Sequence, residues 1–383
     1  MRFLYSHRTR AADGQYVHIK ALTDALAARG HEIFFAGPDD DAAGKALDAG
    51  SGGGLKKMLP KAVYECAEYG YSFPAYTRLK KRARAAAPDI IYERYNLFYH
   101  AGVWAKQRLG LPLILEINAP LAQERAQHGG LALKGLARKS EQAIWRAADM
   151  TLPVTDALAD HVRAAGVPDE RITVIQNGVG DDFLTPRDPH PIRERYGLHD
   201  KVVLGFTGFM RGWHGLDRAV RFIAESRRDD LHLLLVGDGP ARAALEEMAR
   251  DLGVAQKITI TGVVQRDAIA DHVAVFDIAL QPASTDYASP LKLYEYMALG
   301  KAIVAPDQSN IQETVTDGES ALLFAPTDGR AFAAALASLV DDVEIRARLG
   351  DKARARLVSA DYTWAGNAAR VEKIAQLLVG KNK

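Results

Sequence analysis

The sequence predicts an α/β protein with two Rossmann-like domains that face each other across a cleft. Short apolar runs rich in β-branched and aromatic residues alternate with helical patterns, which is typical of parallel sheets covered by helices. At 383 residues the chain also exceeds what one hydrophobic core usually supports. The alternation restarts after a polar segment at 181–200 that contains three prolines. Because proline and polar residues cannot continue a buried strand, we expect the domain boundary there.

The first domain is expected to occupy residues 1–185. Its strand patterns lie at 2–7, 32–37, 89–93, 111–117, 150–154 and 171–179, and helices are indicated at 16–28 and after 155. Thr155 stands at the start of the second of these helices, where its hydroxyl can accept a backbone N–H. We therefore expect Thr155 to be the N-cap of that helix.

The second domain is expected at 186–363, with strand patterns at 201–208, 231–237, 257–262, 277–283 and 301–306. Helices are indicated from 216, from 240 and over 291–298. We expect a last helix over 364–380 to pack back on the first domain. Open α/β sheets bind ligands at the carboxyl ends of their strands, so the predicted cleft is where a site is expected.

Composition narrows the function. The apolar fraction of 48% and the charged fraction of 25% are ordinary for a globular protein. The net charge of +1 argues against a nucleic-acid partner, because nucleic-acid-binding domains are usually strongly basic. The single cysteine, Cys66, cannot form an internal disulfide, which fits a reducing compartment, and we expect a buried, unreactive thiol. No stretch approaches the roughly 20 apolar residues of a membrane span, so we expect a cytoplasmic protein, at most peripheral at the inner face of the cell membrane.

Two glycine-containing loops follow strand patterns. Gly237 and Gly239 in VGDGP let the backbone come close to a ligand without a Cβ in the way, and a tight strand-to-helix turn explains them equally well. Arg242 stands where a dinucleotide fingerprint needs its third glycine, which disfavours an NAD or FAD site. Gly14 has the same two explanations, because amides at the start of its helix could face a sugar or a phosphate.

The sequence gives no sign of a metal cofactor. It contains no HExxH motif, no paired CxxC and no EF-hand loop. Asp39, Asp40 and Asp41 form an acidic run after a strand pattern, which we expect to be a solvated loop, with metal binding as the alternative. We therefore expect neither a metal nor any other cofactor.

The most specific pattern lies at 284–327, STDYASPLKLYEYMALGKAIVAPDQSNIQETVTDGESALLFAPT. This segment resembles the donor-site signature of family 4 glycosyltransferases, which have the GT-B fold. The segments GQYVHIKALTDALAARGHEI, RAADMTLPVTDAL and LLLVGDGPARAALEEMARDLGVAQKITITGVV are also similar to that family. The resemblance implies a retaining transferase that takes its sugar from a UDP- or GDP-linked donor without bound metal. It further implies a glycan acceptor, lipid-linked, in the assembly of bacterial surface polysaccharides.

The resemblance assigns the donor to residues at strand ends and at the start of the helix at 291–298. Amides at the start of that helix can point at a diphosphate, with the helix dipole behind them. One turn further, Glu295 matches the glutamate that holds the donor ribose in the family. The expected donor-binding residues are Gly208, Gly237, Gly239, Val263, Ser289, Pro290, Leu291, Lys292 and Glu295.

The donor site departs from the family pattern in two places. The first glutamate of the family's pair falls at Tyr287, and neighbouring Asp286 could replace its contact with the sugar hydroxyls. The usual arginine and lysine fall at Phe209 and His214, which removes two fixed positive charges from a diphosphate site.

The remaining cations near this site are Arg211 and Lys292. We expect both to take part in catalysis, and we expect Lys292 to have taken over diphosphate binding. The alternative for each is an exposed, solvated side chain.

The acceptor domain differs from the family as well. Many relatives carry a histidine near the donor's anomeric carbon where this chain has Asn118, and an asparagine cannot act as a general base. Asn118 could orient the sugar instead, and Glu116 or Glu124 could interact with the acceptor hydroxyl. The alternative for Glu116 is a hydrogen-bonded polar end of its strand. Arg94 is a further candidate for acceptor binding, together with Gly14 and Glu124.

Residues 55–84 are strongly basic and carry interleaved aromatic residues. Against Glu65 and Glu68 stand Lys56, Lys57, Lys61, Arg78, Lys80, Lys81, Arg82 and Arg84. Such a mixture suits an anionic membrane surface, and a solvated helix face with its aromatic residues in the core explains it equally well.

Two other classes of function share this fold. One is a protein that binds a nucleotide sugar without turnover, which the residues at Tyr287 and Asn118 would fit. The other is a sugar-nucleotide epimerase, against which the segment SPLKLYEYMALG argues.

Overall fold

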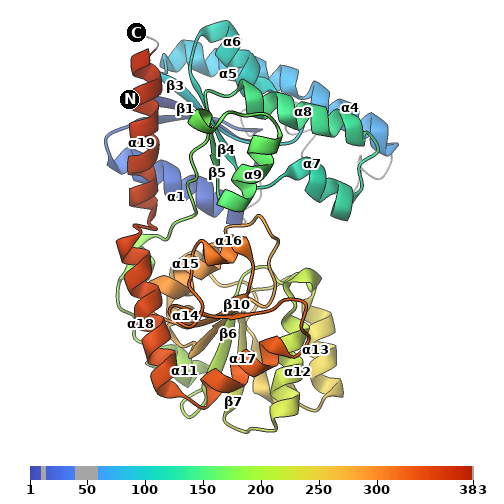
Figure 1. The fold of residues 1–383 in the computed structure, drawn as a ribbon, viewed down its shortest axis with the longest axis vertical. Coiled ribbons are helices and arrows are strands. Elements are labelled where there is room, and N and C mark those ends of the chain that lie inside the picture. Colours follow the sequence, from blue (N-terminus) through green and yellow to red (C-terminus); the bar gives the residue numbers. More distant parts are fainter. Residues whose placement is uncertain (10–13, 39–58, 382–383) are drawn as a thin grey trace. The chain divides into compact units, whose positions relative to one another are not determined.

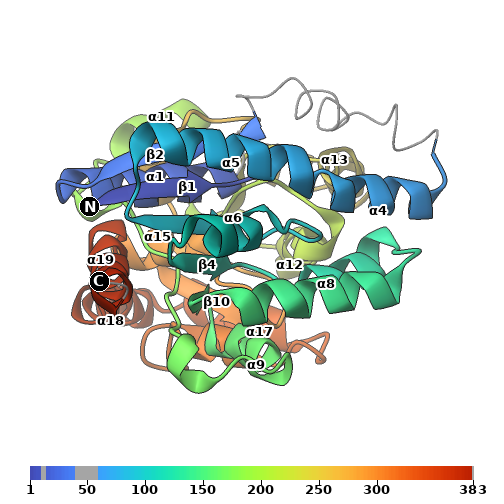
Figure 2. The same cartoon turned by 90° about the horizontal axis from the view of Figure 1, so that it is seen from above.

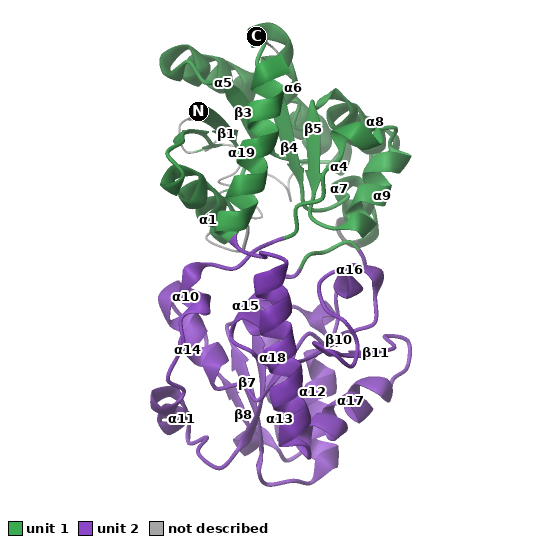
Figure 3. Cartoon of the chain, turned by 60° about the vertical axis from the view of Figure 1, so that its left-hand side comes forward, with its two compact units in different colours: residues 1–176, 287–289, 364–383 green, residues 177–286, 290–363 purple. Residues whose placement is uncertain are grey.

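The computed structural model describes residues 1–9, 14–38 and 59–381 (Figure 1). Contacts along the chain divide it into two compact units (Figure 3). Unit 1 consists of Met1–Gln176, Tyr287–Ser289 and Trp364–Lys383, and unit 2 consists of Asn177–Asp286 and Pro290–Thr363. The first segment of unit 1 ends at Gln176, before the boundary expected at 185. The chain passes between the units more than once, so neither unit is one continuous segment.

Within the described residues, unit 1 contains a five-stranded sheet in the order β2-β1-β3-β4-β5, paired in parallel throughout. Its strands are β1 (Arg2–Ser6), β2 (Glu32–Ala36), β3 (Ile90–Arg94), β4 (Leu113–Ile117) and β5 (Met150–Pro153). Every residue of β3 and β4 is buried, including Glu93, Arg94 and Glu116 among residues that are otherwise apolar or aromatic. The helices are α1 (Gly14–Ala28), α4 (Lys61–Gly70), α5 (Ser72–Ala86), α6 (Ala101–Leu109), α7 (Leu121–Glu124), α8 (Lys134–Ala147), α9 (Asp156–Ala164) and α19 (Trp364–Lys381).

Local sequence explains several boundaries in unit 1. The Thr155 hydroxyl accepts a hydrogen bond from the Leu158 amide at 3.1 Å, which confirms Thr155 as the N-cap of α9. The segment at 171–179 does not form the expected strand: Ile172 makes an isolated bridge with Thr151, and the amides of Thr173 and Ile175 donate to Thr151 O and Pro153 O, so the segment runs beside β5 without completing a ladder. Helices α4 and α5 follow one another almost end to end in Figure 2. The last helix, α19, packs against α1.

Unit 2 contains a six-stranded parallel sheet in the order β11-β10-β9-β6-β7-β8 within the described residues. The strands are β6 (Val202–Thr207), β7 (Leu231–Val236), β8 (Ile258–Ile260), β9 (Ile278–Leu280), β10 (Ala302–Pro306) and β11 (Leu322–Phe324). The helices are α10 (Asp181–Leu184), α11 (His190–Tyr196), α12 (Leu216–Ser226), α13 (Arg242–Asp251), α14 (Ile269–Ala274), α15 (Leu291–Ala298), α16 (Ser309–Gln312), α17 (Ala331–Val340) and α18 (Val343–Ser359).

The segment expected as a linker, 181–200, belongs to unit 2 and contains α10 and α11. Gly197 ends α11 with a φ of 66°, a left-handed conformation that glycine adopts without strain. Two apolar clusters cover the sheet of this unit, one with Leu204 and Leu233 and the other with Val203 and Leu234. This alternation buries both faces of the sheet and leaves its strand ends for a ligand. No helix in the described part of the chain is both long and apolar enough to span a membrane.

Candidate active site

The loops after β6 and β7 are hydrogen-bonded to each other at the carboxyl edge of the sheet in unit 2. The amide of Gly208 donates to Val236 O at 2.9 Å, and the amide of Met210 donates to Asp238 O at 2.8 Å. A Cβ on Gly237 would lie 2.2 Å from Gly208 O, and one on Gly239 would lie 2.3 Å from Met210 O. Both distances are too short for any side chain. The two glycines are therefore needed for the close approach of these loops, which supports the tight-turn explanation.

Lys292 lies in the first turn of α15, beneath the loop that follows β6. Its Nζ is 4.2 Å from the centroid of the Phe206 ring, and a Cβ on Gly208 would lie 3.6 Å from the same Nζ. Within the described residues, the Lys292 ammonium group has neither a hydrogen bond nor an ion pair. Its contact is the cation–π interaction with the Phe206 ring. Burial lowers its pKa to about 8, although Glu295 partly opposes that shift. A partly desolvated ammonium group without a counterion is prepared to bind an anion.

The loop at 208–215 contributes one fixed charge. Burial, together with Lys292 and Arg211, lowers the pKa of His214 to about 3, so His214 is neutral at pH 7. The His214 Nδ1 accepts a hydrogen bond from the Arg211 amide at 3.1 Å, which leaves the ring proton on Nε2. The Arg211 guanidinium is exposed and lies 5.4 Å from the centroid of the exposed Phe209 ring. Arg211 and Lys292 are therefore the cations of this loop region, and His214 can offer only a neutral donor.

Glu295 is buried on the same helix as Lys292 and is held from one side. The Arg266 Nη1 donates to Glu295 Oε1 at 2.6 Å, and the Arg266 guanidinium lies 5.0 Å from the centroid of the Phe183 ring. No hydrogen bond in the described structure uses Glu295 Oε2, so this oxygen is available to hydroxyl groups. Sequence reasoning missed Arg266, because the two residues lie 29 positions apart and no local motif connects them.

Tyr287 stands in place of the first glutamate of the family's pair, and its side chain does not take over that glutamate's contact with the sugar. Its side chain is buried in the apolar core of unit 1, and its carbonyl accepts a hydrogen bond from the Thr155 hydroxyl at 2.8 Å. Asp286 beside it is exposed, as is Val263, while Ser289 before α15 is buried. A large aromatic side chain at 287 thus serves packing, and Asp286 is the carboxylate of this segment that faces solvent.

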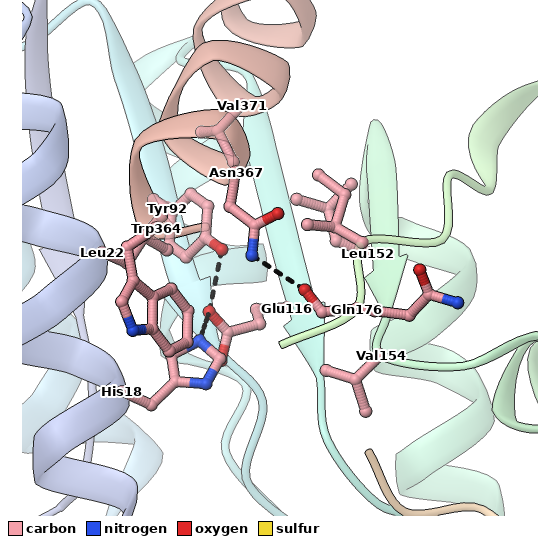
Figure 4. Close-up of a pocket in the computed structure, with 11 residues that line it drawn as sticks. His18, Leu22, Tyr92, Glu116, Leu152, Val154, Gln176, Trp364, Asn367 and Val371 are labelled. Carbon is pink, nitrogen blue, oxygen red and sulfur yellow. Dashed lines mark hydrogen bonds and ion pairs between the residues drawn. The ribbon is translucent and has the colours of Figure 1, made fainter. Parts of the chain in front are cut away.

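In unit 1, Glu116 near the end of β4 is a buried carboxylate with four hydrogen-bond donors, of which Figure 4 draws Tyr92 and His18. Its Oε2 accepts from the Tyr92 hydroxyl at 2.8 Å and pairs with His18 Nε2 at 3.1 Å. Its Oε1 accepts from Asn118 Nδ2 at 2.6 Å and from the Arg94 guanidinium. Burial alone would raise the pKa of Glu116, but His18, Arg94 and the hydrogen bond from Asn118 hold it well below its usual range.

This network brings Arg94, Glu116 and Asn118 together. Because all the strong donors around Glu116 are used to hold it ionised, the structure favours the alternative of a hydrogen-bonded strand end over a general base. A cavity of about 10 Å³ beside it, large enough for one water at most, is also lined by Trp364 and Asn367 of α19. Glu124, half-exposed on α7, is not part of this network, and Gly14 opens α1.

Two further buried acids were not found from the sequence. Burial raises the pKa of Glu141 to about 7, and this carboxylate accepts from the Tyr95 hydroxyl at 2.9 Å and from the Ala122 amide at 3.1 Å. Burial raises the pKa of Glu93 to about 8, and Glu93 accepts from the Ser6 hydroxyl at 2.8 Å. Glu141 therefore fixes the start of α7, while Glu93 lies inside the sheet core.

Several expectations concern metal binding and reactivity. The part of the chain that the structure describes contains no group of three or more histidine, cysteine, aspartate or glutamate residues that could hold a metal ion. Asp39 to Asp41 lie outside the described residues, as do Lys56 and Lys57. Cys66 is exposed on α4, so the expectation of a buried thiol is wrong. The amphipathic pattern of α4 places that position on its solvent side.

Comparison with solved structures defines the fold. HepE from Anabaena in complex with UDP superposes with a TM-score of 0.77 at 17% identity, over 98% of this chain and 99% of HepE. At such an identity the likeness shows the fold alone, and that fold is GT-B.

Comparison with sequence families defines the class of enzyme. The model for "Glycosyltransferase Family 4" matches residues 12–183, and the model for "Glycosyl transferases group 1" matches residues 201–342. D-inositol 3-phosphate glycosyltransferase 2 of Catenulispora acidiphila is 31% identical over 302 residues, which cover 73% of this chain and 69% of that protein. A GDP-mannose-dependent alpha-(1-6)-phosphatidylinositol monomannoside mannosyltransferase of Mycolicibacterium smegmatis is 28% identical, over 69% of this chain and 70% of that protein. The chain belongs to family 4 of the glycosyltransferases, as the resemblance implied, and it is a transferase enzyme.

Proposed function

We propose that this enzyme is a retaining glycosyltransferase that moves a sugar from a UDP- or GDP-linked donor to a lipid-linked glycan, without a bound metal. Unit 2 binds the donor and unit 1 binds the acceptor. The reaction serves the assembly of bacterial surface polysaccharides at the inner face of the cell membrane. The observation that carries the proposal is Lys292, a partly desolvated cation without a counterion among the described residues, in the first turn of α15.

The donor diphosphate is assigned to the start of α15. The first amides of a helix attract anions, and a lysine in that position is otherwise unfavourable because it opposes the helix dipole. Lys292 and Arg211 supply two positive charges, and the neutral His214 can supply one Nε2–H donor. Together these groups neutralise a diphosphate without a metal ion. Glu295, held through Oε1 by Arg266, accepts the ribose hydroxyls through Oε2.

Catalysis in this proposal is mainly electrostatic. The bond between the sugar's anomeric carbon and the diphosphate oxygen breaks, and the nucleoside diphosphate leaves with the electron pair. The acceptor hydroxyl oxygen bonds to the anomeric carbon, and its proton passes to the departing diphosphate oxygen. Groups that are already aimed at the growing negative charge of the leaving diphosphate lower the barrier. Asn118 cannot act as a nucleophile or base, and Glu116 is fully hydrogen-bonded, so we favour attack from the face that the leaving group occupied.

Names of related proteins support both parts of the proposal. HepE was solved with UDP, and the mycobacterial relative is named for a GDP-mannose donor and a phosphatidylinositol mannoside acceptor. A nucleoside diphosphate is common to both donors, and the second acceptor is a glycolipid. The identity of the sugar in this enzyme is therefore the part to be found by screening.

Binding and turnover are tested with the purified protein and a panel of UDP- and GDP-sugars. We expect one donor to raise the melting temperature by mass action and to release its nucleoside diphosphate when an acceptor is present. Mass spectrometry of the product then distinguishes the classes of function. Binding without any release would indicate a protein without turnover, and a product of unchanged mass would indicate an epimerase. NMR of the new linkage shows whether the anomeric configuration is retained.

The membrane part of the proposal rests on α4 and α5. Glu65 and Glu68, the acids of this segment, are buried: Glu65 accepts from the Leu133 amide at 2.7 Å and Glu68 pairs with Arg125 at 2.8 Å. Arg78 is buried against Tyr71 and does not reach solvent. Basic residues therefore make up a larger share of the exposed charged residues than of all charged residues in this segment. Within the described part of this segment, residues 59–84, the exposed basic residues are Lys61, Lys81, Arg82 and Arg84.

Apolar residues accompany these charges. Phe73 is 66% exposed and Val63 is 50% exposed, whereas Tyr71 is part of the core. We expect vesicles with anionic lipid to bind the protein more strongly than neutral vesicles in flotation, because each basic residue near the surface contributes about 1 kcal/mol. The double variant Phe73→Ser and Arg84→Gln should bind less, and a matched variant with Arg221→Gln and Arg250→Gln in unit 2 should not. Equal flotation on neutral and anionic vesicles would remove the membrane part.

A further inference from the structure

A second cavity lies in unit 2 near the amino ends of the strands, whereas the proposed donor site lies at their carboxyl ends. Its volume is about 270 Å³, and it is lined by residues from the segment after α10, from the end of α15 and from α18. Lys301 in its wall comes directly before β10, whereas Gly208 and Gly237 come directly after β6 and β7. In a parallel sheet, positions directly before the strands and positions directly after them lie at opposite ends of the strands, so the two sites are separate.

Three cations from distant parts of the sequence line this cavity, namely Arg187, Lys301 and Arg354. Lys301 Nζ donates to Ala274 O at 2.6 Å and Arg354 Nη2 donates to Leu184 O at 3.5 Å, and both are uncharged partners. Arg187 donates to Asp182 O and pairs with Asp271 at 3.3 Å. Within the described residues, neither Lys301 nor Arg354 has a carboxylate within ion-pair distance.

The desolvation of Lys301 makes this charge surplus significant. Burial lowers its pKa to about 8, an effect that Arg193 increases and Asp277 opposes. The ammonium group is therefore still charged at pH 7, in a place that penalises the charge. It uses one of its three donors, and the Arg354 guanidinium, with five N–H donors, makes one long hydrogen bond. Most of their hydrogen-bonding capacity is left for an anion.

The rest of the wall determines the size and kind of ligand. Pro186, Ala298 and Leu299 provide apolar surface beside the cations. Pockets for drug-sized molecules have about 300–1,000 Å³, so a cavity of about 270 Å³ suits a small molecule. Two guanidinium groups and an ammonium group are the usual partners of phosphate in proteins.

We propose that this cavity binds a phosphate monoester of a small organic molecule such as a hexose phosphate. The phosphate lies between Lys301, Arg354 and Arg187, and the carbon skeleton lies against the apolar wall. Leu299 follows the last residue of α15, the helix whose first turn holds Lys292. Phe183 also lines the cavity, and Arg266, which holds Glu295, lies over the same ring. The occupant therefore adjoins two elements that support the donor site.

Calorimetric titration tests this proposal without using the transfer reaction. The titrations are done in a Lys292→Ala background, because the proposed donor site also binds phosphate. In this background we expect saturable binding of a hexose 6-phosphate that is tighter than binding of inorganic phosphate, with no binding of the free hexose. Adding Arg354→Gln or Lys301→Gln should weaken that binding about tenfold or more, because each removes a charge-assisted hydrogen bond. The matched control is Arg221→Gln, which removes an exposed arginine of α12 and should leave the affinity unchanged.

Two results would overturn the assignment. One is the absence of saturable binding in the Lys292→Ala protein. The other is an affinity that stays unchanged in both Arg354→Gln and Lys301→Gln. Lys301 is half-buried, so its variant is checked by thermal melting, while Arg354 is exposed on α18 and its replacement should leave folding intact. Because the measurement is binding at a site that excludes Lys292, its outcome is independent of the proposed function.

Discussion

Two substitutions of Lys292 distinguish the effect of its charge from the effect of its size and shape. Lys292→Ala removes a preorganised donor to the diphosphate, and the loss of one such donor typically lowers turnover by about 10²–10³-fold. Lys292→Arg keeps the charge but must fit a larger group beneath Gly208, where the lysine already lies close to the glycine backbone. We therefore expect the arginine variant to recover part of the rate. Lys352→Ala, which changes an exposed lysine of α18, is the control that should leave the rate unchanged.

The pH profile gives an independent measure of the same residue. Burial lowers the pKa of Lys292 to about 8, so the ammonium form that binds an anion is present below pH 8 and is lost above it. About nine in ten molecules carry the charge at pH 7 and about one in ten at pH 9, by the ordinary titration relation. Because kcat/KM reports groups of the free enzyme, we expect it to fall about tenfold between these pH values, and Lys292→Arg should abolish that fall. Near-full activity and nucleotide affinity in Lys292→Ala would refute this reasoning and leave Arg211 to be tested.

Three further predictions follow from the described contacts. Arg266→Ala should raise the KM for the donor more than it lowers kcat, because Glu295 loses the partner that holds Oε1; Arg266→Lys should restore part of the affinity, and an unchanged KM would contradict the positioning role. Transfer should continue in excess EDTA, and a strict requirement for Mg²⁺ or Mn²⁺ restored by titration would contradict the metal-free proposal. Burial raises the pKa of Glu93 to about 8, so the folded chain keeps a proton that the unfolded chain loses near its ordinary value, and stability should fall from about pH 5 to pH 8. Glu93→Gln cannot ionise and should flatten that slope in urea denaturation; an equal slope in both proteins would show that Glu93 is ionised in the fold.

Much of the fold was predictable from sequence because buried parallel strands leave a strong local pattern. The runs at β3, β4 and β7 are mostly apolar, and all their residues are buried, including the charged or polar Glu93, Arg94, Glu116 and His232. The segment at 171–179 has a similar composition but pairs with β5 only through one bridge and two backbone hydrogen bonds, without forming a strand. Local pattern does not reveal how completely a segment pairs with its neighbour. Likewise β11 is too short to show a period.

The candidate site was less predictable, because its geometry depends on residues far apart in the sequence. The motif around Glu295 located α15, but the partner Arg266 follows a different strand. Glu116 was recognised as a charge at the end of a strand, while the donors that fix its state come from α1 and β3, at His18 and Arg94. Tyr287 could be placed in the motif but not in the core of unit 1, since burial there depends on how the chain returns.

The return of the chain to unit 1 also affects the order in which the two units can be completed during synthesis. Most of unit 1 is translated before unit 2, yet its surface is completed by α19, which is translated after unit 2. The ring centroids of Trp364 in that helix and His18 in α1 lie 4.8 Å apart. The Glu372 carboxylate of α19 accepts a hydrogen bond from Arg29, which follows α1. Domains generally fold as units while the chain is being made, N-terminal first. Here unit 2 can fold before α19 has left the ribosome. Unit 1 therefore stays incomplete until unit 2 has been translated, and the surface of α1 that α19 covers is exposed until then.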